Sequence, residues 1–346
     1  AELSWLWGVN RGILTPPGLD EQWLVSLAHT KTTWACWWST STTWRKPCAP
    51  NRMSVVVIGG SNLDTIARTN TAPVAETSNP GRTTVRPGGV GRNIAENLAR
   101  LGTDVTLISA LGAGHAAQTL RESLAGAGLR EVDSGHDTGS YTAVLNDNGG
   151  LVIGVADMAA TDAITPDLLK SEWFGGASVV VLDGNLPIDT LARAMELAGD
   201  AAVMLDPVSV AKGCRLRDLA ALPLHTFTPN HDELLAIAQT DSIEEACEWA
   251  HQRGVEYVWL REGAAGSLLS STHGSARIPV APARTVVDVT GAGDAALAAY
   301  VHRIMLGDSP QIAATFGAHA AKHTIEVAGA VAPLTRALLE SEMEAQ

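Results

Sequence analysis

The second half of the chain alternates between short runs of strand-forming residues and segments of helical period. The runs at 179–182, 202–205 and 225–228 each end in a polar loop, and helical segments follow near 191–197 and after 229–233. Strand and helix in this alternation are typical of a doubly wound, mostly parallel sheet flanked by helices. We therefore predict an α/β fold whose loops gather at the carboxyl edge of the sheet, where such folds bind ligands.

Residues 287–294 run directly into an Ala- and Leu-rich segment that favours a helix. Gly291, Ala292 and Gly293 allow a tight turn and leave backbone N–H groups uncovered at the helix start. Because free N–H groups and the positive end of the helix dipole both attract anions, we predict a phosphate site here. Asp294 is then either a general base for a hydroxyl that attacks the phosphate, or only an acid of the first helical turn.

Two further groups of polar residues fall at the same edge. Asn62 and Asp64 follow the buried strand at 55–58 and either bind vicinal hydroxyls or form an Asx turn. Gly88 and Gly89 open a helix that runs to Leu101 and carries Asn93 in its first turn. Neither a Gly-x-Gly-x-x-Gly fingerprint nor a Gly-x4-Gly-Lys-Ser/Thr loop is present, which disfavours a dinucleotide fold and excludes a P-loop.

Residues 140–145 and 151–155 flank an Asn- and Gly-rich turn, which predicts a β-hairpin. With the strand near Thr84 the hairpin should form a small sheet, separate from the main one. We expect this small sheet, from about 62–86 and 138–158, to act as a lid that closes over a substrate and excludes water.

Two of these stretches together resemble the ribokinase-like (PfkB) family of sugar and nucleoside kinases. Residues 287–294 resemble its second signature and residues 87–93 its first, in the same order along the chain. The resemblance implies that Gly291, Ala292 and Gly293 supply an anion hole and Asp294 the catalytic base. It also implies that Gly88, Gly89 and Asn93 hold the sugar. Asn62 and Asp64, at the same edge of the sheet, would then bind its hydroxyl groups.

The resemblance extends to the nucleotide side. Asn230 and Glu233 match the Asn-x-x-Glu element that helps hold Mg²⁺ and the phosphates of ATP, and 258–266 matches the strand and glycine turn at the ATP site. Arg261 departs from this pattern, because related kinases usually carry a small hydroxyl residue there. The other expected ATP-binding residues are Gly263, Gly266, Thr290 and Lys212; Lys212 either approaches the phosphates or is a surface lysine. A monovalent cation such as K⁺ is a further expectation, and so is a homodimer formed through the lid.

Several stretches outside the two signatures, including 78–81, 140–141 and 156–158, resemble the pseudouridine kinase branch of the family. This resemblance implies transfer of a phosphoryl group from ATP to the 5′-hydroxyl of a ribonucleoside, with the lid residue Tyr141 among those that would contact it. The alternatives are a ribokinase or another sugar or nucleoside kinase, and a ligand-sensing protein on an inactive kinase scaffold. A dehydrogenase is disfavoured by the missing dinucleotide fingerprint.

Composition limits the binding partners and the cellular location that we expect. The net charge of −13 argues against a nucleic-acid surface, and the chain has neither a long apolar run nor a basic-then-apolar leader, so we expect a cytoplasmic protein without a membrane span. The 4 cysteines are scattered without metal-like spacing. Residues 1–52 hold most of the 10 tryptophans and no regular period. We interpret them as an extension outside a single kinase domain at 53–346, the alternative being a tryptophan-rich binding arm.

Overall fold

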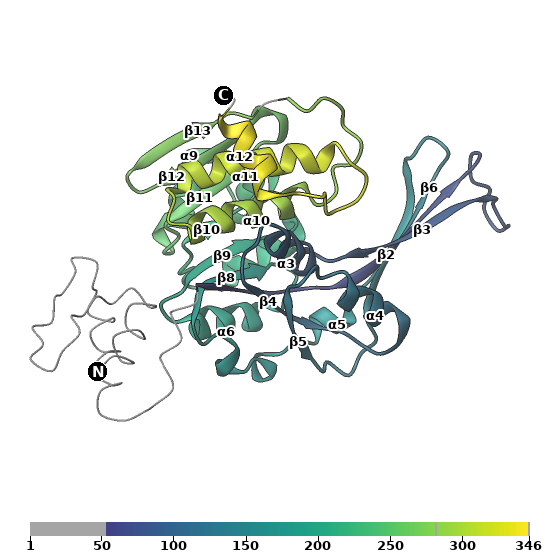
Figure 1. The fold of residues 1–346 in the computed structure, drawn as a ribbon, viewed down its shortest axis with the longest axis horizontal. Coiled ribbons are helices and arrows are strands. Elements are labelled where there is room, and N and C mark those ends of the chain that lie inside the picture. The colour runs from purple at the N-terminus through teal and green to yellow at the C-terminus, as the bar shows by residue number, and fades with distance from the viewer. Residues whose placement is uncertain (1–52, 281, 345–346) are drawn as a thin grey trace, which may run out of the picture. The chain divides into compact units, whose positions relative to one another are not determined.

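The computed structural model describes residues 53–280 and 282–344, so the expectations for residues 1–52 lie outside the described residues. Within those ranges the strands form a nine-stranded sheet and a separate four-stranded sheet (Figure 1). The predicted α/β architecture with a small additional sheet is confirmed. Within the same ranges no helix is both long and apolar enough to cross a membrane.

The strands of the nine-stranded sheet are β1 (Ser54–Ile58), β4 (Val105–Ala110), β5 (Gly128–Val132), β8 (Ala177–Asp183), β9 (Ala202–Asp206), β10 (Thr226–Phe227), β11 (Tyr257–Arg261), β12 (Ser267–Ser271) and β13 (Gly274–Ile278). Those of the small sheet are β2 (Asn62–Thr69), β3 (Gly81–Gly88), β6 (Gly139–Leu145) and β7 (Leu151–Asp157). The α-helices are α3 (Val90–Arg100), α4 (Gly114–Glu122), α5 (Ala159–Asp162), α6 (Ile188–Ala198), α7 (Val210–Gly213), α8 (His231–Ala238), α9 (Ile243–Gln252), α10 (Ala292–Met305), α11 (Pro310–Ile325) and α12 (Arg336–Glu344).

The large sheet has the order β13-β12-β11-β10-β9-β8-β1-β4-β5. Pairing is parallel from β5 to β11, and the last two strands add antiparallel. Strand β1 lies between β4 and β8, so the chain leaves β1 toward one side and later returns on the other. Doubly wound folds bind ligands at such a reversal, beyond the carboxyl end of the strand.

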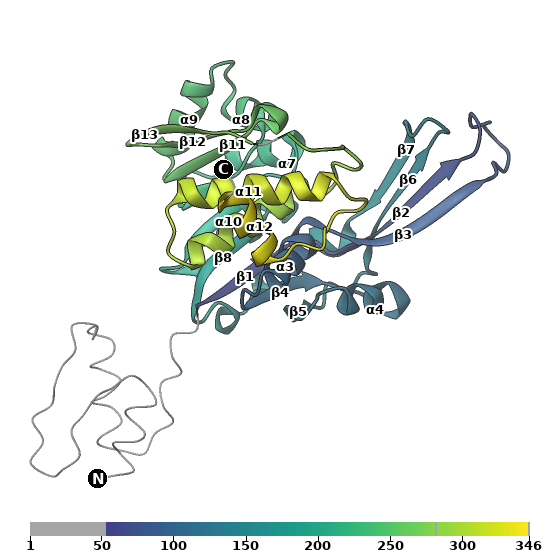
Figure 2. The same ribbon diagram turned by 45° about the horizontal axis from the view of Figure 1, so that its top comes forward.

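Both faces of the sheet are buried, and the residues of β1 alternate between the two cores. Val55 and Val57 belong to the apolar core that α3, α10 and α11 cover, whereas Val56 and Ile58 belong to the core covered by α6, α8 and α9. A parallel strand covered on both faces needs an unbroken apolar run, which is what the chain has here. Helices α10 and α11 lie side by side on one face and bring the start of α10 to the carboxyl edge (Figures 1 and 2).

The small sheet, called the lid below, has the order β3-β2-β6-β7 and projects from the large sheet (Figure 2). The predicted hairpin is its β6–β7 pair, and the strand predicted near Thr84 is β3. Asn62 and Asp64 belong to β2 instead of a loop, because Asn62 pairs with Gly88 and Asp64 with Arg86. The ladder thereby places both side chains on one face of the lid.

Candidate active site

At the carboxyl end of β1, the backbone of the following loop packs directly against the backbone at the start of α3. Gly89, the residue before α3, has φ +96°, and a Cβ there would stand 2.4 Å from the carbonyl oxygen of Gly60. The fully buried Asp183, at the end of β8, accepts hydrogen bonds from the N–H groups of Gly60 (2.9 Å) and Gly91 (3.2 Å). One carboxylate therefore ties the loop after β1 to the first turn of α3, which has no side-chain cap of its own.

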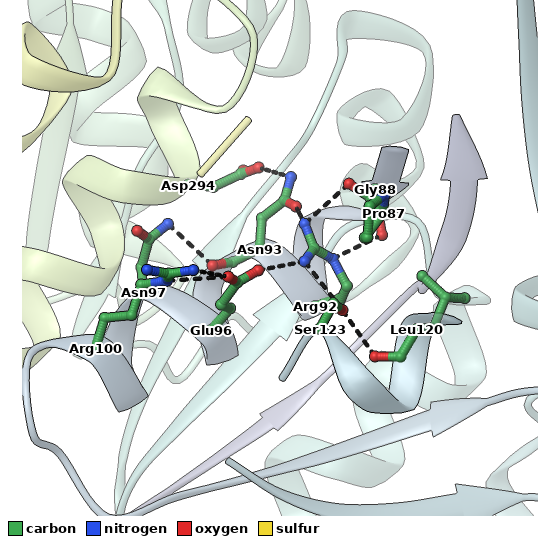
Figure 3. A network of polar contacts seen from close by, with 10 residues as sticks. All are labelled: Pro87, Gly88, Arg92, Asn93, Glu96, Asn97, Arg100, Leu120, Ser123 and Asp294. Atoms are coloured by element: carbon green, nitrogen blue, oxygen red, sulfur yellow. Dashed lines mark hydrogen bonds and ion pairs between the residues drawn. The ribbon is translucent and has the colours of Figure 1, made fainter. Parts of the chain in front are cut away.

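The two signatures meet in space although they lie far apart in the sequence. Asp294 is in the first turn of α10, and α10 packs against α3. The amide Nδ2 of Asn93 donates a hydrogen bond to Oδ2 of Asp294 at 2.7 Å, joining residues 201 positions apart (Figure 3). The candidate sugar-binding residue and the candidate base therefore share one site.

The carboxyl group of Asp294 has a pKa near neutral pH. Burial raises its pKa from 3.8 to about 7, the hydrogen bond from Asn93 opposes this rise, and the carboxylates of Asp206 and Asp183 add to it. A general base is most effective when its pKa lies close to the working pH. This geometry and pKa suit removal of a proton from a hydroxyl group.

Arg92 orients the side chain of Asn93, and the sequence analysis did not predict this role. It is buried, and its guanidinium donates to the carbonyl oxygens of Gly88 and Pro87 at 3.1 Å each, to Oδ1 of Asn93 and to Glu96 (Figure 3). Because Oδ1 of Asn93 accepts from Arg92, its Nδ2 is turned toward Asp294. Burial lowers the pKa of Arg92, and the carboxylate of Glu96 opposes this effect.

The candidate sugar residues of the lid gather beside this network. Asn62 donates to Asp64 (Nδ2–Oδ1 2.5 Å), and a Cβ on Gly88 would lie 2.3 Å from the Asp64 carboxylate. Burial raises the pKa of Asp64. Tyr141 pairs with Asp64 across the parallel β2–β6 ladder and so shares its face, where its ring lies over Gly154.

On the nucleotide side, Asn230 and Glu233 form a reciprocal capping box at the start of α8. The side chain of Asn230 accepts from the N–H of Glu233 (2.9 Å), and the Glu233 carboxylate accepts from the N–H of Asn230 (2.8 Å). A hollow of about 360 Å³ opens here, lined by Asn230, His231, Asp232, Arg261, Glu262 and Gly263. Gly266 ends the glycine turn with φ +91°.

The remaining predicted residues lie at two places. Before α10, the N–H of Thr290 donates to Asp288 (3.0 Å), and Gly291 has φ +76° with the carbonyl oxygen of Ala330 where a Cβ would stand. These contacts hold the turn of the candidate anion hole open. Lys212 instead forms an ion pair with Asp162 (Nζ–Oδ1 3.7 Å), which links α7 to α5, so its approach to phosphates stays a prediction.

The residues fit a magnesium ion that arrives with a nucleotide. Burial and the nearby carboxylate of Asp206 raise the pKa of Glu233, and Arg261 opposes this rise. A cation bound at Glu233 would relieve the repulsion between the two carboxylates. Among the described residues no cluster of three or more His, Cys, Asp or Glu side chains could hold a metal by itself. Mg²⁺ commonly binds through one or two carboxylates, water and substrate phosphates. Glu233 is thus the candidate ligand, and the bound ion would withdraw charge from the phosphates.

Comparison with known proteins agrees with this geometry. The sequence model of the pfkB family of carbohydrate kinases matches residues 52–337. The chain belongs to the pfkB family. It is therefore a phosphotransferase with an alcohol group as acceptor, and the family implies use of ATP, typically with Mg²⁺.

Within the family, the chain is 34% identical to the pseudouridine kinase of Escherichia coli over 256 residues, 70% of this chain and 81% of that protein. It is 28% identical to a ribokinase of Arabidopsis thaliana over 298 residues, 80% of this chain and 77% of that one. A carbohydrate kinase from Agrobacterium tumefaciens has the same fold, with a TM-score of 0.75, 28% identity and coverage of 84% of this chain and 97% of that one. The similarity to these relatives supports a pfkB-family kinase that acts on a sugar or a nucleoside.

Proposed function

We propose that the protein transfers the γ-phosphoryl group of ATP to the 5′-hydroxyl of pseudouridine. The similarity to the E. coli pseudouridine kinase supports the choice of substrate. The observation that carries the reaction is the 2.7 Å hydrogen bond from Asn93 to Asp294, because it puts the candidate sugar-binding loop beside a carboxyl group that accepts protons near neutral pH.

In the proposed reaction the ribose is held so that its 5′-oxygen faces the γ-phosphorus, by Asn62, Asp64, Gly88, Gly89 and Asn93. The bond from that oxygen to phosphorus forms as the bond to the leaving ADP oxygen breaks, and the hydroxyl proton passes to Asp294. The N–H groups of Gly291–Gly293 bear the charge that develops on the phosphoryl oxygens. Positioning and charge stabilisation supply most of the rate enhancement in such transfers.

A substrate panel tests the proposal. Pseudouridine, uridine, ribose, adenosine and fructose 1-phosphate are each offered with ATP and Mg²⁺, and ADP release is followed in a coupled assay. Asp294→Asn is the control that removes the base while retaining the size of the side chain. We expect pseudouridine to give the highest kcat/KM and the control to lose turnover. Equal or faster turnover of uridine would contradict the proposed specificity.

A ribokinase is the second candidate, favoured by the similarity to the Arabidopsis ribokinase along most of the chain. The two candidates differ in what Tyr141 and the lid must contact, since ribose has no base. A kcat/KM for ribose above that for every nucleoside would select this second candidate.

We further propose that a monovalent cation such as K⁺ supports the anion hole. The carbonyl oxygen of Ala330 faces Gly291, and the Asp288 carboxylate accepts hydrogen bonds from the N–H groups of Thr290 and Gly329. Carbonyl and carboxylate oxygens are suitable ligands for a hard cation. Activity in KCl above that in choline chloride of equal ionic strength is the expected result.

We also propose a homodimer formed through the lid. The ladder places Val85 of β3 and Val155 of β7 on the face opposite Asp64, and both side chains are more than half exposed, as is Ile153. An apolar face ending in a free edge strand favours association with a second such sheet.

A further inference from the structure

Arg261 reaches from the sheet to the candidate anion hole. It is the last residue of β11, and a Cβ built on Gly293 would lie 2.2 Å from its Nη1. Because Cα–Cβ bonds of a helix tilt toward the N-terminus, the guanidinium lies beside the first turn of α10. The same side chain lines the hollow on the nucleotide side, so it borders both the candidate ATP pocket and the candidate site of transfer.

The guanidinium is held in place through its other terminal nitrogen. Nη2 donates to the carbonyl oxygen of Thr228 (2.5 Å) and lies 3.0 Å from Oδ2 of the buried Asp206. Asp206 is itself anchored, since its Oδ1 accepts from the N–H of Val208 at 2.8 Å, and Val208 adopts φ +68°. A β-branched residue in that region is strained, and such strain persists where the surrounding structure demands it.

The side of Arg261 that faces α10 offers N–H donors to a further anion. The charge of Arg261 also acts on Asp294 and Glu233 and lowers the pKa of both carboxyl groups, against the rise that burial causes. A cation beside a helix N-terminus is disfavoured by the helix dipole unless a negative group lies near both. Asp206 compensates one side of the guanidinium, and the side toward Gly293 adjoins the predicted phosphate site. An arginine guanidinium carries several N–H donors in a fixed plane, so one terminal nitrogen can hold a carboxylate while the other donates to a phosphate oxygen.

We propose that Arg261 is a catalytic residue whose Nη1, with Nη2 anchored on Asp206, binds the phosphoryl group during its transfer. It acts alongside the N–H groups of Gly291–Gly293, at a position where related kinases usually carry a small hydroxyl residue. The inference rests on the proposed phosphoryl transfer and not on which sugar or nucleoside accepts the group.

The kinetic test compares Arg261→Ala, Arg261→Lys and a matched control, Arg277→Ala. Arg277 is largely exposed and pairs with Glu262 at the same hollow, so its removal costs one charge without touching Gly293. With the acceptor that the panel selects, Arg261→Ala should lower kcat about 10²–10³-fold, the range for loss of one transition-state donor. The KM of the acceptor should change less than about 3-fold, and Arg277→Ala should behave like the parent protein.

Two readouts separate catalysis from a structural role. Added guanidinium ion should restore part of the turnover of Arg261→Ala, and the acidic limb of its kcat profile should move to higher pH, because a positive charge that lowers the pKa of Asp294 is lost. Arg261→Lys retains a cation facing Asp206 and should fold normally, with activity between those of the parent protein and the Ala variant.

A binding measurement keeps the test independent of the acceptor. By calorimetry, Arg261→Ala should weaken binding of ADP with aluminium fluoride, a mimic of the transferring phosphoryl group, at least about 10-fold more than binding of ATP. If the parent protein phosphorylates nothing in the panel, the proposed function fails while this comparison still decides the role of Arg261. Equal losses for the two ligands, or an unchanged kcat in Arg261→Ala, would overturn the inference.

Discussion

At the scale of single residues, the carboxyl group of Asp294 combines burial, a hydrogen bond and a raised pKa. It is buried, hydrogen-bonded by Asn93 and surrounded by the acids Asp183 and Asp206. A helix-capping acid would sit exposed at the surface, with its pKa at or below the ordinary value. The raised pKa therefore favours the base over the simple helix acid, which were the two possibilities left by the sequence.

Replacing Asp294 by Asn should separate activity from stability. Asn cannot accept the proton, so kcat should fall roughly 10²–10⁴-fold while nucleoside affinity survives. The pKa of about 7 in the folded protein exceeds the ordinary value of 3.8, so the stability contributed by protonation is complete below pH 3.8 and is lost as the pH rises through about 7. The Asn variant should therefore melt above the parent protein at pH 8, by a margin that shrinks toward pH 4. Near-normal turnover in a folded Asn variant would remove Asp294 from the mechanism.

Asn93→Ala should weaken binding of the sugar and also change the pKa of the candidate base, Asp294. Loss of a hydrogen bond to a charged group costs about 1.5–3 kcal/mol, which we expect as a higher nucleoside KM together with a lower kcat. Because the amide lowers the pKa of Asp294, the acidic limb of the rate profile should also move to higher pH. Asn148→Ala, in the exposed β6–β7 turn, is the control. Weakened ATP binding with normal nucleoside binding would contradict the assignment.

At the scale of elements, the site depends on how closely the loop after β1 approaches the start of α3. Gly89 and Gly91 bring the backbone of α3 against Gly59 and Gly60, and Asp183 locks the contact from β8. The lid strand β2 begins two residues after Gly60, so the same loop also sets the direction of Asn62 and Asp64.

Gly89→Ala tests this contact, with Gly102→Ala as its matched control. Both glycines have positive φ, +96° and +86°, but only at Gly89 does backbone lie where the new Cβ would stand. The control should lose about 1–2 kcal/mol of stability from backbone strain alone. Gly89→Ala should lose more and should also lose nucleoside affinity. Equal melting temperatures and nucleoside affinities for the two variants would show that the close approach does not shape the site.

At the scale of the whole molecule, the family match covers residues 52–337. The interpretation of residues 1–52 as an extension outside a kinase domain at 53–346 stays a prediction. Protein beginning at Met53 should therefore keep the melting temperature and kcat/KM of the full chain. A large drop in either quantity would indicate that the first 52 residues contribute to the kinase.

The dimer prediction belongs to the same scale. Ile153→Lys puts a charge on the apolar face of the lid, and Thr142→Lys puts one on the same face in the neighbouring strand, where the dimer would also bury it. Both variants should sediment as monomers if the lids associate. His273→Lys, in the turn between β12 and β13, is the control and should not change the sedimentation. A parent protein that is monomeric at micromolar concentration would contradict the prediction.

The sequence by itself determined the α/β class, the separate small sheet and the family, because these follow from local period and from two short signatures. The sequence also identified Asn93 as a candidate sugar-binding residue and, separately, Asp294 as a candidate base. Only the tertiary structure decided that they share a hydrogen bond, that Asp183 and Arg92 support them, and that Arg261 adjoins Gly293. The physical reason is that these contacts join residues far apart in the chain. Which strand ends become neighbours depends on the order of the strands in the sheet, and no local pattern specifies that order.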